Sequence, residues 1–212
     1  MTTPLIQPVA RHVQYVEDGA DILRRAKSNF ANHVMIVEHD DGVHRHLVFR
    51  QPGTSFYGFE IITWPGGLTI TGDMSTMVFR RLNDMIEFFD PDYVNVQYWL
   101  EKERTRPGYD RKQYDVDAFK RWAIADFWER SRDLRHDQTR LWWAELRDVL
   151  EGYEIGSWES AYRTLDHLEH GDYHDLHEDV PAWAVYDFAD MLTLLALLLG
   201  CETYRQHKKE TP

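Results

Sequence analysis

The fold is decided by Ile-Ile-Thr-Trp-Pro-Gly-Gly-Leu-Thr-Ile-Thr-Gly-Asp-Met-Ser-Thr, residues 61–76 of the chain. β-Branched residues on both sides of Pro65-Gly66-Gly67 predict two strands joined by a tight turn, because glycine reaches positive φ without steric cost. The segment Gly72–Thr76 then predicts a loop that opens a helix, with a hydroxyl side chain as the N-cap. Apolar residues at helical spacing over residues 78–89 predict that this helix packs across one face of the sheet.

The preceding residues predict the rest of an antiparallel sheet. Short connections that carry Gly or Pro imply that consecutive strands are antiparallel neighbours. The predicted sheet is a four-stranded meander, and a short helix precedes it. The strands are residues 33–39, 43–50, 56–64 and 68–71, and the helix is residues 20–31.

From residue 93 onward the pattern changes to helical periodicity. Pro107-Gly108 and the charges around it make residues 105–114 the best candidate for a linker. The middle of the last predicted helix, residues 191–199, is apolar on all sides, so we expect it to be the buried centre of the helical part. Helices are predicted over residues 94–104, 116–132, 138–152, 157–170 and 181–205.

These elements predict an α+β fold. We expect a four-stranded antiparallel meander with flanking helices, followed by a mostly α-helical C-terminal half. The sheet region would cover residues 1–92 and the helical region residues 93–212, either as two domains or as one continuous domain.

The charge distribution argues against direct nucleic-acid binding and favours a basic protein partner. The 212 residues carry a formal net charge of −12, and residues 91–212 hold 16 Lys or Arg against 25 Asp or Glu. Such a surface repels phosphate backbones, whereas it attracts a basic protein surface or a cation. A well-solvated protein without a basic partner is the alternative interpretation.

Three features predict a cytoplasmic protein with no membrane partner. The single cysteine, Cys201, cannot form an intrachain disulfide, which fits a reducing compartment, and we expect it to be a small core residue. The N-terminus lacks the basic start and long apolar run of a signal peptide. The longest apolar run, residues 194–199, is far shorter than the roughly 20 residues that span a membrane.

The first candidate site is the loop Gly72–Thr76. A loop that opens a helix points backbone N–H groups outward and can hold an anion. Asp73 would act there as a base or a cation ligand, with Ser75, Thr76 and Trp64 close by. The glycine spacing and the lysine of a phosphate-binding loop are absent. The alternative is an ordinary turn with a capping residue.

The second candidate is a histidine-rich and acidic segment. His167, His170, His174 and His177 lie among six acids over residues 166–179. Histidine and carboxylate ligands at such spacing could bind zinc or manganese, although no catalytic zinc motif is present. A solvated acidic loop is the alternative, and we expect no cofactor. His44 and His46, with Arg50 and Glu60, would line the polar face of the sheet, either as a shallow groove or as an ordinary solvent face.

The tryptophans form a third kind of candidate, because seven of the eight lie after residue 93. Trp142 and Trp143 are adjacent, so they cannot both face one core from one helix. We expect one of them to be exposed as an anchor for a partner. A broad buried face with an intrachain neighbour is the alternative.

Residues 56–89 resemble a group of small proteins encoded by phages and prophages. The shared features are a Thr-Trp-Pro-Gly turn at residues 63–66, a Gly-Asp-Met loop at residues 72–74 and a Phe-x-Arg-Leu helix at residues 79–82. The resemblance covers about a fifth of the chain and implies a genomic setting, not a reaction. No catalytic residue carries over from it.

The sequence therefore predicts a phage or prophage accessory protein that acts by protein–protein binding in the host cell cytoplasm. Inhibition of a host defence system, in the manner of anti-CRISPR or other anti-defence proteins, is one form of this role. The alternative is an enzyme or small-ligand-binding protein whose site is the Gly72–Thr76 loop.

Overall fold

The computed structural model describes residues 2–13, 19–92, 94–106, 111–171, 173 and 183–210. The chain divides into two compact units. We call Met1–Arg111 together with Asp187–Pro212 the sheet unit, and Lys112–Tyr186 the helical unit.

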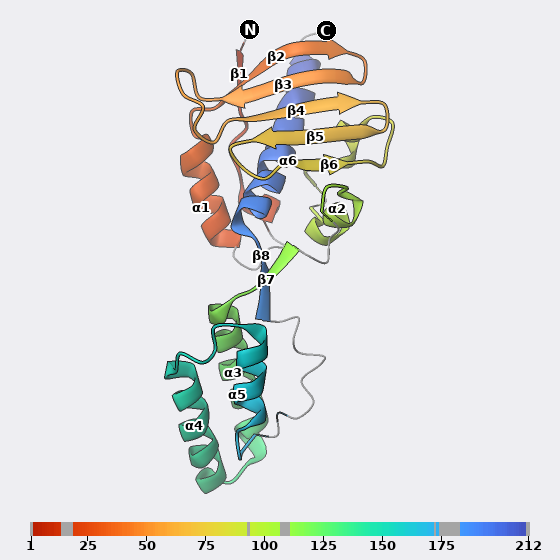
Figure 1. Cartoon of the computed structure of the whole chain (residues 1–212). Coiled ribbons are helices and arrows are strands. Elements are labelled where there is room, and N and C mark those ends of the chain that lie inside the picture. Colours follow the sequence, from red (N-terminus) through yellow and green to blue (C-terminus); the bar gives the residue numbers. More distant parts are fainter. Residues whose placement is uncertain are drawn as a thin grey trace. The chain divides into compact units, whose positions relative to one another are not determined.

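The sheet unit is built on six antiparallel strands whose order in the sheet follows their order in the chain (Figure 1). The α+β class is confirmed, but the prediction of four strands was wrong, because one further strand lies at each edge. The strands are β1 (Thr2–Pro4), β2 (Val34–Asp41), β3 (His44–Arg50), β4 (Phe59–Trp64), β5 (Gly67–Gly72) and β6 (Met77–Phe79).

Alternation along the strands divides the sheet into a buried inner face and an outer face. In β3, Arg45, Leu47 and Phe49 are buried, while the residues between them are more exposed. Phe49 stacks on Phe59 of β4 with the ring centroids 4.6 Å apart. The inner face is therefore the core of this unit, because successive side chains of a strand point to opposite sides.

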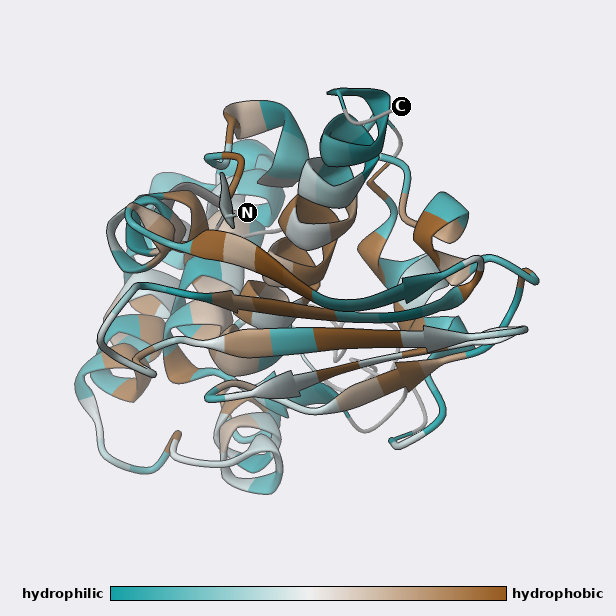
Figure 2. Ribbon diagram, turned by 90° about the horizontal axis from the view of Figure 1, so that it is seen from above, coloured by the Kyte–Doolittle hydropathy of each residue, from teal (hydrophilic) through white to brown (hydrophobic). Residues whose placement is uncertain are grey.

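The core is completed by α6 (Phe188–Glu210), which runs behind the strands in Figure 1 and contacts β1, β2, β4 and α1 (Gly19–Phe30). A Cβ atom at Gly200 would lie 2.6 Å from Cδ1 of Ile61, so glycine lets the helix approach the sheet closely. Figure 2 shows α6 apolar where it crosses the strands and hydrophilic toward its C-terminus. Residues 191–199 are buried as predicted, but they lie in the core of the sheet unit and not at the centre of the helical part.

The prediction of a helix over residues 78–89 was wrong. Met77 and Phe79 belong to strand β6, both with 0% exposure, and only Met85–Phe88 form a short 3-10 helix, η2. Apolar residues at this spacing can be buried either by a strand or by a helix. The strand forms here because pairing with β5 satisfies the backbone hydrogen-bonding groups of β6. Leu82, expected on the buried stripe, is exposed.

The outer edge of β6 is closed by the segment that follows α2 (Val96–Lys102). Glu103 forms an antiparallel bridge with Phe79, and the N–H of Arg104 donates to the carbonyl of Val78 at 2.8 Å. Near the N-terminus a 3-10 helix, η1 (Ala10–Val13), packs against α1.

The helical unit has its own aromatic core. Trp142, Trp183 and Tyr173 are buried, and Phe127 meets Trp142 edge to face with the centroids 4.9 Å apart. Asp115 and Ser157 cap two of the helices through their side chains. The elements are β7 (Lys112–Tyr114), α3 (Val116–Arg130), η4 (Ser131–Asp133), α4 (His136–Glu151), α5 (Trp158–Asp166) and β8 (Ala184–Tyr186), with β7 and β8 paired antiparallel.

The predictions of α3, α4 and α5 are confirmed, but the predicted last helix is divided. Residues 184–186 form β8, and α6 begins at Phe188 and packs in the sheet unit. A helix that is apolar on all sides needs apolar neighbours on all sides, and the sheet with α1 supplies them. The division of the structure at residues 111 and 187 therefore differs from the expected boundary at residue 92.

Candidate functional site

The Gly72–Thr76 loop joins two strands, so the helix N-terminus expected there does not exist. The Asp73 carboxylate accepts the backbone N–H of Tyr57 at 3.0 Å. The N–H of Ser75 donates to Thr193 at 3.0 Å, and the hydroxyls of Thr76 and Thr71 lie 2.9 Å apart. These hydrogen bonds hold two loops and α6 together, and they give a structural role to the side chains of Asp73 and Thr76 and to the backbone of Ser75.

Trp64 lies on the outer face of the sheet and is half-buried. Its indole covers Gly67 on the neighbouring strand: a Cβ atom there would lie 2.1 Å from Cε2 of the ring. This close approach explains why the turn needs a glycine at position 67. Trp64 pairs with Gly67 at one end of β5, whereas Gly72 pairs with Phe59 at the other end, so Trp64 does not lie beside the Gly72–Thr76 loop as expected.

The tryptophan exposed in the helical unit is Trp128 and not the pair that was predicted. Trp142 is 1% exposed, so the prediction that it could anchor a partner was wrong, and Trp143 is half-buried against the same core. Trp128 is 62% exposed. The sequence does carry this signal. Phe119 and Phe127 define the buried side of α3, and Trp128 falls on its far side at 100° per residue.

A second exposed apolar residue lies one turn from Trp128 on the same face of α3. Ile124 is 38% exposed, and the i, i+4 spacing places it beside Trp128. Asp117 and Glu129 are exposed on the same helix. We call the exposed side of α3 that carries Ile124 and Trp128 the α3 face.

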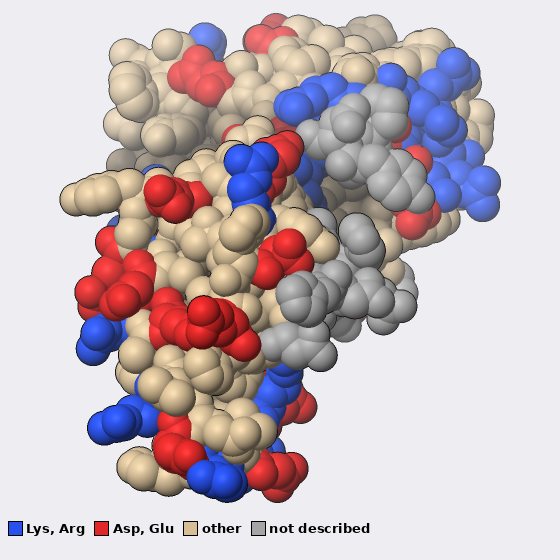
Figure 3. Space-filling view, turned by 60° about the horizontal axis from the view of Figure 1, so that its bottom comes forward, with Lys and Arg blue, Asp and Glu red and all other residues tan. Residues whose placement is uncertain are grey.

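The acid excess belongs mainly to the helical unit. Residues 112–186 hold 9 Lys or Arg and 17 Asp or Glu, a net charge of −8. Figure 3 shows groups of Asp and Glu on the surface, with Lys and Arg gathered elsewhere. The α3 face therefore lies on an acidic unit with an aromatic side chain at its centre.

The histidine cluster is only partly within the described residues. His170 and Glu145 form an ion-pair contact of 2.7 Å, and the ligand atoms of these two residues and Glu169 lie within 4.8 Å of one another. His167 instead contacts the carbonyl of Arg163 at 2.6 Å. His174 and His177 lie outside the described residues. The three ligand atoms could hold a divalent cation, and the contact between His170 and Glu145 needs no metal.

His46 and His44 lie on the outer face of the sheet, as the alternation predicts. His46 pairs with Glu60 across the neighbouring strand at 2.8 Å, and His44 is exposed. The pair is more than one third exposed, so its contribution to stability is small.

Sequence reasoning missed two ionic clusters in the sheet unit, the first of them partly buried. In the first, the Arg45 guanidinium donates to both carboxylate oxygens of Asp84 at 2.9 and 2.7 Å and to the Tyr204 hydroxyl at 2.9 Å. The Tyr204 hydroxyl donates to Asp40 at 2.8 Å. Burial and the hydrogen bond to Asp40 raise the pKa of Tyr204 to about 12. This cluster ties α6 to two segments of the sheet unit.

The second cluster is fully buried. Arg111 contacts Glu103 and Asp190 at 2.7 Å each, and all three side chains are 0–1% exposed. Burial opposes ionisation of Glu103, but hydrogen bonds from Thr105, Arg106 and Arg111 outweigh it and lower the pKa of the carboxyl. Arg111 lay in the expected linker, so the charge pattern alone did not identify it as a core residue.

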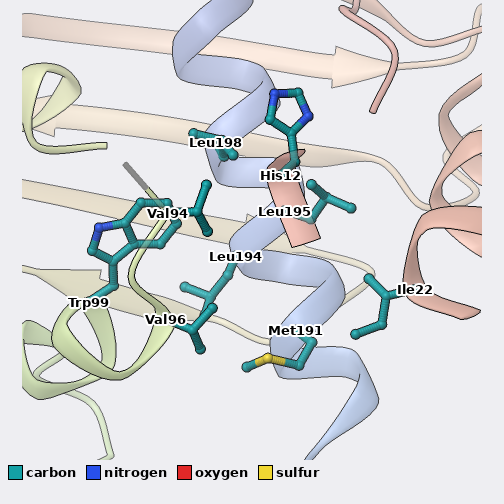
Figure 4. A pocket seen from close by; sticks show the side chains of 9 residues that line it. All are labelled: His12, Ile22, Val94, Val96, Trp99, Met191, Leu194, Leu195 and Leu198. Carbon is teal, nitrogen blue, oxygen red and sulfur yellow. The ribbon is translucent and has the colours of Figure 1, made fainter. Parts of the chain in front are cut away.

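A small apolar pocket lies between α6, α1, η1 and α2 (Figure 4). Its volume of about 10 Å³ has room for roughly one water molecule. His12, at its rim, accepts the N–H of Val9 and lies 3.3 Å from Glu202. Burial lowers the pKa of His12 despite the opposing effect of Glu202. The pocket is too small for an organic ligand.

Cys201 is fully buried in α6, and burial raises the pKa of its thiol to about 12. This confirms that it is a core residue, since a reactive cysteine needs an accessible thiolate.

No family model matches the chain, and no curated protein or solved structure matches it. Among the described residues, no helix has both the length and the apolar character required to cross a bilayer.

Proposed function

We propose that the protein is a phage or prophage accessory protein that acts by binding another protein, with inhibition of a host defence system as one form of that role. The phage setting comes from the resemblance of residues 56–89. The α3 face is the proposed contact surface. The observation that carries the proposal is the 62% exposure of Trp128 on a unit with an aromatic core of its own.

An exposed tryptophan supports partner binding because burying a large flat side chain at the centre of an interface supplies much of the binding energy. Ile124 extends the apolar contact by one helical turn. The net charge of −8 on the helical unit favours a partner with a basic surface, since complementary charge speeds association and disfavours other partners.

The enzyme alternative has no specific observation in its favour. It required Asp73 to be free at a helix N-terminus, whereas the Asp73 carboxylate accepts a backbone N–H from Tyr57. We therefore assign no catalytic residue.

The test is capture of host proteins on immobilised chain, followed by measurement of the affinity for the captured partner. Trp128→Ala should weaken binding by about 30-fold or more, which corresponds to about 2 kcal/mol for an aromatic anchor. Tyr153→Ala is the matched control, because Tyr153 is a fully exposed aromatic residue of the same unit outside α3. It should leave the affinity within about twofold.

Charge reversal of Asp117 and Glu129 to Lys should lower the association rate and the salt dependence of binding. The proposal is contradicted if no partner is captured, if Trp128→Ala and Tyr153→Ala behave alike, or if binding does not respond to salt.

A further inference from the structure

The sheet unit carries a local cationic surface, although the net charge of the chain is negative. Arg80, Arg81 and Arg104 are all exposed, and none has an ion pair or side-chain hydrogen bond with a described residue. Figure 3 shows Lys and Arg side chains gathered together on one part of the surface. Unpaired like charges repel each other, so such a group is best satisfied by an anionic partner.

The strand pairing determines the direction of two of these arginines. Phe79 and Glu103 form an antiparallel bridge and are 0% and 3% exposed, so both point inward. Their neighbours Arg80 and Arg104 therefore point to the outer face, because successive side chains of an extended chain alternate. The N–H of Arg80 donates to the carbonyl of Lys102 at 3.4 Å, which completes this pairing.

The same register places an aromatic ring on the same face of the sheet as Arg80. Leu68 pairs with Phe79, the last residue of β6, so Gly67 and Arg80 are the next positions along this antiparallel register. The Trp64 indole lies over Gly67. The outer face thus carries both the half-buried Trp64 indole and the exposed Arg80, whose side chain has no ion pair with a described residue. No described helix of the sheet unit crosses this face, since α6 packs on the other one (Figure 1).

We propose that this surface binds single-stranded nucleic acid, with the arginines on phosphates and a base stacked on Trp64. A single strand fits because its bases are free to stack on an aromatic side chain while its backbone follows the cations. A duplex keeps its bases stacked inside, so it could not use the indole. An acidic peptide would satisfy the arginines and leave the ring unused.

The acidic residues elsewhere in the chain limit the expected affinity for nucleic acid. Glu60 lies on the same face, where its carboxylate is 2.8 Å from Nε2 of His46. A net charge of −12 still opposes binding, so we expect a dissociation constant on the order of 10 μM at low salt and steep weakening as salt is added. The expectation that nucleic acids are repelled rests on the charge of the whole chain and does not address this local surface.

The experiment is a fluorescence anisotropy titration of the full chain with a short fluorescein-labelled oligothymidylate at several salt concentrations. Arg80→Glu with Arg104→Glu should weaken binding at least about tenfold and reduce the salt slope by about 1.4, at about 0.7 per lost phosphate contact. The matched control is Arg132→Glu with Arg140→Glu. Both control residues are exposed in the helical unit, and that variant should bind within about twofold of wild type.

Stacking is tested without altering the fold by an oligonucleotide of the same length that lacks bases. It should bind about tenfold more weakly than oligothymidylate, and Trp64→Leu should remove that difference. The proposal is overturned if oligothymidylate does not bind, if both arginine pairs have equal effects, or if the abasic strand or poly-glutamate of equal charge competes as well as oligothymidylate.

Discussion

Replacement of Arg111 by Met should be among the most destabilising single changes in the sheet unit. The guanidinium contacts two carboxylates at 2.7 Å, and none of the three side chains is more than 1% exposed. Removing one partner of a buried ion pair leaves an uncompensated buried charge, which costs about 3–5 kcal/mol. That cost is a large fraction of the roughly 5–15 kcal/mol by which domains are stable.

Loss of Arg111 should leave Asp190 less well compensated than Glu103. Glu103 keeps backbone N–H donors from Thr105 and Arg106 at 2.6 and 2.8 Å, whereas Oδ1 of buried Asp190 has no hydrogen-bond partner among the described residues. Asp190→Leu should therefore rescue Arg111→Met by more than about 1 kcal/mol, because residues in one ionic network are energetically coupled.

Urea unfolding at neutral pH, followed by circular dichroism, measures both effects. Arg11→Ala is the control. Arg11 is 50% exposed and pairs with the exposed Asp92 and the partly buried Glu202, so its loss should cost no more than about 1 kcal/mol. The reasoning is refuted if Arg111→Met lowers the free energy of unfolding no more than Arg11→Ala does. It is also refuted if adding Asp190→Leu to Arg111→Met lowers that free energy further instead of raising it.

Three further predictions concern single residues. Burial lowers the pKa of His33 below its ordinary 6.5, so the unfolded chain binds the proton more readily; stability should fall as pH drops below about 6.5, and His33→Gln should reduce that slope in urea melts. Gly72 has φ +148°, and a Cβ there would lie 2.2 Å from the Gly58 carbonyl, so Gly72→Ala should cost about 2 kcal/mol or more in thermal unfolding, and an unchanged midpoint would contradict this. The Cys201 thiol should react with a disulfide reagent only after denaturation; rapid labelling of the native chain would disprove its burial.

The parts of the fold that sequence could predict are those whose signals are local. The hairpin around Gly42, which has φ +60°, and the helices with capping residues such as Asp115 and Ser157 follow from neighbouring residues alone. β6 could not be predicted in this way. Met77 and Phe79 suit either a strand or a helix, and the choice depends on pairing with β5, which no local pattern contains.

The functional residues, too, could be predicted only where the deciding signal was local in the sequence. Trp142 and Trp143 were ambiguous because the breadth of the buried face of α4 depends on how α3 packs against it. Trp128 was recoverable from the periodicity of α3. Arg111 looked like part of a charged linker, and its buried contacts with Glu103 and with Asp190, 79 positions away, make it a core residue.

The central claim is that the α3 face binds a partner protein through Trp128. The most direct measurement is the dissociation constant of the captured partner for wild type, Trp128→Ala and Tyr153→Ala at low and high salt. We predict a loss of about 30-fold for Trp128→Ala alone, together with weaker wild-type binding at high salt. Equal affinities for the three chains at either salt concentration would contradict the account.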